Sequence, residues 1–178
     1  MELTRRDAAA ALAALGAGGV AAVAVGGDDE PESDRSADID EAAITETMVA
    51  AAEVVYPDTV TGIDDFVNTF LDSRLTGESH ATGVDNAVTA VNDRARSWYG
   101  DRFAALGADT RDTVLREMGT DTAEPRRDGS TAEKVRYYVV NELLLALYSS
   151  PTGGELVGIE NPQGYAGGIE SYQRGPQP

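Results

Sequence analysis

Few residues in this chain have side chains suited to catalysis. The sequence contains no cysteine and a single histidine, His80. Without cysteine there are no disulfides, thiolate nucleophiles or iron–sulfur ligands, and one histidine cannot build a histidine-rich or mixed zinc site. His80 follows Gly77 at an expected helix start. We therefore expect a solvated histidine near a helix cap rather than a metal ligand or a general base.

Paired carboxylates are the remaining candidates for acid–base chemistry of the kind that glycosidases perform. Such pairs occur at Asp64-Asp65 and where Asp38 precedes Asp40-Glu41. Both groups lie at expected helix starts, where negative side chains complement the helix dipole. No P-loop is present, and no glycine-rich dinucleotide fingerprint follows a strand. The sequence thus predicts no catalytic residue, no cofactor-binding residue and no metal ligand in this chain.

The chain is strongly acidic, and this charge excludes some classes of binding partner. Asp and Glu number 31 against 14 Lys and Arg, for a net charge of −17, and Lys134 is the single lysine. A surface of this kind repels nucleic acid and anionic lipid, so we exclude both as partners. High salt screens the self-repulsion of such a chain, and the composition therefore indicates a halophilic source, which we expect to be an archaeon.

The N-terminus has the pattern of an export signal. Arg5 and Arg6 precede an uncharged stretch from Ala8 to Val25 that is rich in alanine and glycine. We interpret residues 1–26 as a signal of the twin-arginine type, which places the protein on the extracytoplasmic face of the cell membrane. A retained membrane anchor is the alternative. The acidic segment 27–38 has too little apolar content to order itself, and it predicts a disordered linker.

Residues 39–150 show the spacing of amphipathic helices and no strand pattern of useful length. We predict an all-α fold, a single bundle of about five helices with an extended, irregular C-terminal tail over residues 151–178. Tyr56-Pro57 ends the first helix, and Ser130 with Glu133 forms a capping box at the start of the last. A second capping box is expected at Thr61 and Asp64, and Trp98 is expected in the core.

The last helix and the tail are the expected partner-binding region. From Tyr137 to Tyr148 the helix is apolar around much of its circumference, which is typical of a helix covered on several sides. Extended Pro/Gly segments with spaced aromatic residues commonly dock on another surface. The residues predicted to contact a partner are Leu143, Leu147, Tyr148, Pro151, Leu156, Ile159, Pro162 and Tyr165.

Several of these segments resemble the gluconate 2-dehydrogenase subunit 3 family. The points of likeness are the Arg5-Arg6 leader, the helix end Val54-Val55-Tyr56-Pro57, the segment from Leu143 to Gly153 with its Tyr-Ser-Ser-Pro-x-Gly turn, and Asn161-Pro162-Gln163-Gly164-Tyr165. The resemblance implies a non-catalytic small subunit that binds a large FAD-dependent dehydrogenase of the glucose–methanol–choline type, assists its maturation and carries it to export. FAD would be held by the large subunit, which would oxidise gluconate or a related sugar or alcohol. Electrons would then pass to a cytochrome subunit or to quinone.

A second hypothesis stays open beside this one. The chain would then be a free-standing exported helical module that binds a small ligand, and a deep apolar pocket between its helices would favour that function.

Overall fold

In the computed structural model, which describes residues 1–16 and 39–158, every regular element is helical, as the sequence predicts. The short 3-10 helix η1 covers Phe103–Ala105, and η2, Arg136–Asn141, is a π-helix. The α-helices are α1 (Arg5–Ala14), α2 (Glu41–Val55), α3 (Ile63–Arg74), α4 (Glu78–Tyr99), α5 (Ala108–Glu117), α6 (Thr131–Val135), α7 (Glu142–Ser149) and α8 (Pro151–Leu156).

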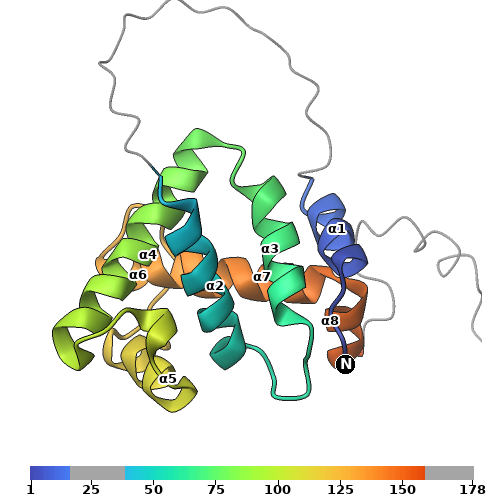
Figure 1. The fold of residues 1–178 in the computed structure, drawn as a ribbon. Coiled ribbons are helices and arrows are strands. Elements are labelled where there is room, and N and C mark those ends of the chain that lie inside the picture. The colour runs from blue at the N-terminus through green and yellow to red at the C-terminus, as the bar shows by residue number, and fades with distance from the viewer. Residues whose placement is uncertain (17–38, 159–178) are drawn as a thin grey trace, which may run out of the picture.

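The elements α6, η2 and α7 follow one another without a break and form one continuous helical segment, which we call the central rod; α2 and α3 lie in front of it in Figure 1. Its N-terminus carries the predicted capping box: the Ser130 N–H donates to Oε2 of Glu133 at 2.7 Å, and Oγ of Ser130 accepts from the Glu133 N–H. The rod packs against α2 and α4, and its later part packs against α1 and α8. The last predicted helix is therefore central to the domain.

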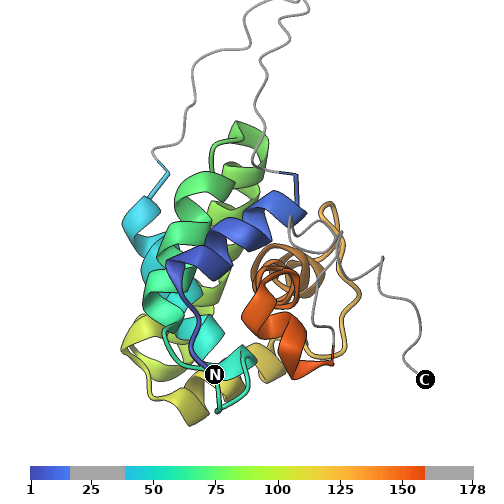
Figure 2. The same ribbon diagram turned by 90° about the vertical axis from the view of Figure 1, so that its right-hand side faces the viewer.

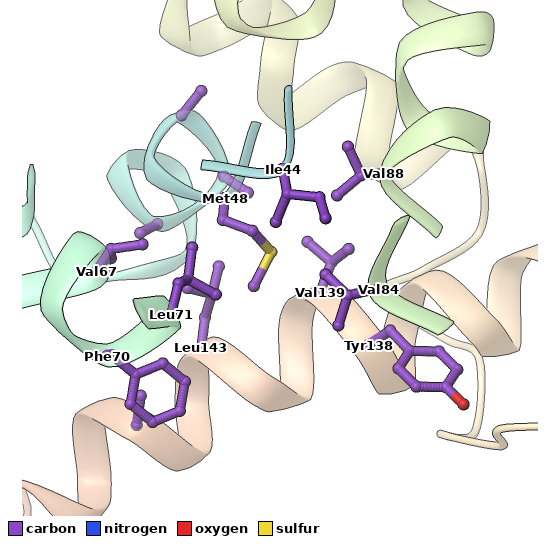
Figure 3. Packing of buried hydrophobic residues seen from close by; sticks show 14 of the residues in the cluster. Ile44, Met48, Val67, Phe70, Leu71, Val84, Val88, Tyr138, Val139 and Leu143 are labelled. Atoms are coloured by element: carbon purple, nitrogen blue, oxygen red, sulfur yellow. The ribbon is translucent and has the colours of Figure 1, made fainter. Parts of the chain in front are cut away.

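The core forms where α2, α3, α4 and the rod meet. Figure 3 shows Met48 reaching between the helices, with Ile44 and Val88 on one side and Leu71 and Leu143 on the other. These side chains are almost completely removed from water, and burial of each large apolar side chain contributes roughly 1.5–3 kcal/mol. The helical periodicity in the sequence identified most of this core correctly.

Two local predictions are wrong. Helix α3 has no side-chain cap, because its N-cap residue is Gly62, which has no side chain; the hydroxyl of Thr61, one residue earlier, donates to the carbonyl of Met1. Trp98 is 39% exposed rather than buried, with the guanidinium of Arg94 lying 4.4 Å from its ring centroid. A cation stacked over the ring gives the indole a partner at the surface.

The N-terminal segment is part of the folded domain in this structure. Helix α1 packs against α3, α7 and α8, and the two views show it lying along the same side of the molecule as α8 (Figures 1 and 2). Leu3, Ala8 and Ala11 are buried at this contact. The prediction of a separate signal segment over residues 1–26 rests on charge and hydropathy, and these properties do not indicate packing against distant helices.

The tail does not begin as an extended segment. Pro151–Leu156 forms α8, because Oγ of Ser150 accepts from the Gly153 N–H at 3.0 Å and Pro151 occupies the first helical turn, where its missing N–H costs nothing. Residues 159–178, the rest of the predicted tail, lie outside the described residues, as does the predicted linker. Among the helices that are described, none has both the length and the apolarity to cross a membrane.

Candidate partner-binding surface

One side of α7 faces solvent with large apolar side chains. Leu145 is 43% exposed and Tyr148 is 42% exposed, and Leu144 beside them is half-buried. Together with the end of α3 and the π-helix η2 they border a groove of about 420 Å³. The groove is lined by Arg74, Tyr137, Asn141, Glu142, Leu144, Leu145 and Tyr148. We call it the α7 groove.

Among the predicted partner contacts that lie in the described residues, one lines the groove. Tyr148 lines it, whereas Leu143 and Leu147 are fully buried and belong to the core of the chain itself. Pro151 and Leu156 are half-buried in α8. Ile159, Pro162 and Tyr165 lie outside the described residues. In this structure, then, the side chains of Leu143 and Leu147 are not available to a partner.

Sequence reasoning missed Leu144 and Leu145 for an identifiable reason. Leu143 and Leu147 have the four-residue spacing of a helix face, and that spacing indicates a shared face without saying whether the face points inward. A second observation could have identified them: Leu144 and Leu145 are apolar too, although the opposite side of the helix already packs in the core. A helix with two apolar sides needs a packing partner for each of them.

A buried ion-pair cluster closes one end of the groove. Glu142, the first residue of α7, is 4% exposed. Nε of Arg74, from the last turn of α3, donates to Oε1 of Glu142, and Nε2 of His80, from the first turn of α4, lies 3.5 Å from the same oxygen. The cluster therefore ties the α3–α4 corner to the central rod.

The charge of Glu142 is maintained by these neighbours. Burial by itself raises the pKa of the carboxyl, but the interactions with His80 and Arg74 lower it more, so the pKa of Glu142 lies below its ordinary value. The His80 side chain is 17% exposed and packs beside Tyr138, with 5.7 Å between the ring centroids. The expectation of a solvated histidine is wrong, because the rod folds over it.

The π-helix η2 places one aromatic ring at the α7 groove and the next against α4. The rings of Tyr137 and Tyr138 meet edge to face with their centroids 4.8 Å apart, and the guanidinium of Arg127 lies 5.8 Å from the Tyr137 ring. Tyr137 faces the groove, while Tyr138 is buried toward α4. A π-helical turn is rare and is frequently found at functional sites, which agrees with a binding function for this part of the rod.

A second cavity, of about 480 Å³, lies between α4 and α6. Its walls carry polar and basic side chains, among them Thr82, Asn86, Arg127 and Lys134, over a floor that includes Tyr138. This open, polar hollow differs from the deep apolar pocket that a small-ligand module requires.

The carboxylates of the described residues do not converge on a reactive centre. Asp64 and Asp65 lie exposed in the first turn of α3, where Asp65 pairs with Arg5 at 3.4 Å. In residues 1–16 and 39–158, no group of three or more His, Asp and Glu side chains is placed to hold a metal ion. The described part of the chain presents an apolar groove along α7, which suits the binding of a polypeptide.

Comparison with known proteins agrees with a binding function. A family model described as gluconate 2-dehydrogenase subunit 3 matches residues 42–167. Neither the curated proteins nor the solved structures contain a match to the chain. The description names one subunit of this dehydrogenase, which implies association with its other subunits. The match covers most of the chain and includes every helix that borders the α7 groove, so the chain belongs to the gluconate 2-dehydrogenase subunit 3 family.

Proposed function

We propose that this chain is the non-catalytic small subunit of an FAD-dependent dehydrogenase of the glucose–methanol–choline type, and that the large subunit binds in the α7 groove. The large subunit would hold the FAD and oxidise gluconate or a related sugar or alcohol. Electrons would leave it for a cytochrome subunit or quinone. The small subunit would contribute binding and maturation, and no side chain of its own would enter the reaction.

The observation that carries this proposal is the exposure of Leu145 and Tyr148 on the central helix. Both are large apolar side chains that would lose most of their contact with water under a partner, and aromatic anchors of this kind dominate binding energies in interfaces. Arg74 and Asn141 at the edge of the groove supply polar groups for its rim. An apolar centre with a polar rim is the usual composition of a subunit interface.

The export part of the proposal rests on the N-terminus. Arg5 and Arg6 precede the uncharged stretch from Ala8 to Val25, and both arginines lie on the surface. A twin-arginine signal is read by a receptor and serves proteins that cross the membrane folded. We propose that the small subunit supplies this signal for the complex, which would then work at the extracytoplasmic face of the cell membrane.

Co-expression with the large subunit tests the proposed interface. Leu145→Ser and Tyr148→Ser should each weaken retention of the large subunit by about tenfold or more, which corresponds to about 1.4 kcal/mol. Trp98→Ser is the matched control, because Trp98 is similarly exposed but lies at the end of α4, outside the groove. Retention is measured by affinity capture of the small subunit and quantification of the co-purified flavoprotein.

Two results would contradict the proposal. If the Leu145, Tyr148 and Trp98 variants retain equal amounts of the large subunit, the α7 groove is not the interface. If the large subunit acquires FAD and reaches its normal activity in cells that lack the small subunit, the small subunit has no function in maturation.

A further inference from the structure

The first residues of the chain are attached to the body by backbone hydrogen bonds. The Leu3 N–H donates to the carbonyl of Thr61 at 2.7 Å, and the Thr61 N–H donates to the carbonyl of Met1 at 2.8 Å. These bonds form a short parallel bridge between Glu2 and Thr61 just before α3. The Leu3 side chain is buried at this point.

The helix that follows is fastened at its own N-terminus. The Thr4 side chain and Asp7 form a capping box, and Oδ1 of Asp7 also accepts from the Thr152 N–H of α8 at 3.0 Å. Asp7 is 6% exposed, so this bond is shielded from water. Such a buried, charge-assisted bond gives α1 a defined position on α8.

In the docked segment, one part of the proposed export signal is exposed to solvent and the part after it is buried. Arg5 and Arg6 lie on the exposed side of α1. Ala8, Ala11 and Leu12, with which the uncharged stretch of the signal begins, are buried against α3, α7 and α8. The paired arginines are thus accessible to a receptor, while the apolar start of the proposed signal is buried.

The order of α1 depends on its contacts with the body. A helix of 10 residues is marginal in water on its own, even when rich in alanine. Alanines bury little apolar area, so Leu3 and Leu12 contribute most of the contact. The exposed ion pair of Arg5 with Asp65 adds little. The segment is therefore ordered by its contact with the body, to which the Asp7–Thr152 bond and the Leu3 and Leu12 side chains contribute most.

The surface that holds the segment belongs to the part of the chain shared with the family. The family match begins at residue 42, so α1 lies outside it, whereas α3, α7 and α8 lie inside. The same α7 packs against α1 and carries Leu145 and Tyr148 at the α7 groove. Tyr148, which lines the groove, is followed in the chain by Ser150, which caps α8, and by Thr152, whose N–H donates to Asp7.

We propose that residues 1–15 are a latch: they stay docked on α3, α7 and α8 in the free subunit, and binding of the large subunit at the α7 groove and the α7–α8 corner releases them. The apolar start of the signal then becomes available only in the assembled complex. The releasing partner in this proposal rests on the proposed function, whereas docking in the free subunit does not.

A single glycine allows the latch to be opened without altering the signal. Gly62 has φ of +76°, and a methyl group there would overlap the carbonyl oxygen of Leu3. Gly62→Ala should therefore displace residues 1–3 and loosen α1. Gly100→Ala is the matched control, because Gly100 has φ of +80° and open space around it, so the variant has the same backbone strain without the overlap.

Amide hydrogen exchange of the full chain, read by mass spectrometry, measures the latch directly. In the free wild-type subunit and in Gly100→Ala, the amides of α1 should be protected; in Gly62→Ala their exchange should be at least tenfold faster. The amides of α4 report whether each variant is folded. In the purified complex with the large subunit, the wild-type α1 amides should exchange as fast as in free Gly62→Ala.

The outcomes separate this inference from the proposed function. If α1 in the free wild type exchanges at the rate of an unstructured peptide, or if Gly62→Ala and Gly100→Ala behave alike, the latch does not exist. If the complex forms and α1 stays protected in it, release by the large subunit is wrong. If no complex forms, the proposed function fails and release fails with it, while the two glycine variants still decide whether the segment docks.

Discussion

Asp7 in the N-terminal helix accepts a hydrogen bond from the Thr152 backbone N–H, 145 positions later in the chain, at 3.0 Å. The bond joins the beginning of the described chain to α8, near its end. It gives the N-terminal segment a structural function that its charge and hydropathy do not indicate. The same carboxylate accepts from the Thr4 backbone N–H and hydroxyl, so one residue both caps α1 and docks it.

Replacing Asp7 with alanine should therefore loosen α1 more than the loss of a capping residue alone. We expect at least tenfold faster amide exchange in α1, with little change in α4, because a buried bond to a charged group contributes about 1.5–3 kcal/mol. Glu133→Ala is the control, since Glu133 occupies the equivalent position of the α6 capping box and makes no bond to another helix. Equal loosening of α1 and α6 would show that the Thr152 bond contributes nothing.

The cluster at the end of the α7 groove predicts a stability difference between two ion pairs. Glu142→Gln should lower the free energy of unfolding by about 1–3 kcal/mol, because it leaves the Arg74 guanidinium without its buried counter-charge. Asp112→Asn breaks the exposed pair with Arg116 and should have little effect. Urea unfolding of both variants checks this, and similar midpoints for the two would contradict it.

The same carboxyl predicts how stability depends on pH. The pKa of Glu142 in the folded chain is lowered from about 4.5, the value expected when unfolded. Its contribution is therefore complete above about pH 4.5 and is lost as the pH falls through the folded pKa, since the unfolded chain binds the proton first. Wild type should lose more stability than Glu142→Gln between pH 5 and pH 3 in urea unfolding. Parallel losses would show that Glu142 is not responsible.

The turn between α7 and α8 depends on a glycine for steric reasons. A methyl group on Gly153 would overlap the carbonyl oxygen of Leu147, which also accepts a hydrogen bond from the Ser150 hydroxyl at 2.7 Å. Gly153→Ala should destabilise the fold by about 1–3 kcal/mol, as overpacking does. Gly107→Ala, at an open helix N-cap, is the control. Thermal unfolding measures both, and a Gly153 variant as stable as its control would contradict this account.

The candidate site was only partly predictable because its residues are joined by contacts between distant segments. Tyr148 was expected to bind a partner, and it lines the α7 groove. Arg74, Tyr137 and Asn141 were not expected there, since they come together only when α3 packs on the rod and η2 takes its π-helical form. Nothing in the order of residues places Arg74 and His80 on the same oxygen of Glu142.

The sequence by itself determined the helical class, the helix end at Tyr56 before Pro57, the cap at Ser130 and the family, because these depend on neighbouring residues and on short-range spacing. The tertiary structure alone decided that Leu143 and Leu147 face inward while Leu145 and Tyr148 face water, and that residues 1–15 pack on the body. A helix that is apolar on two sides has two equivalent ways to meet its neighbours, and only the packing of the other helices selects one.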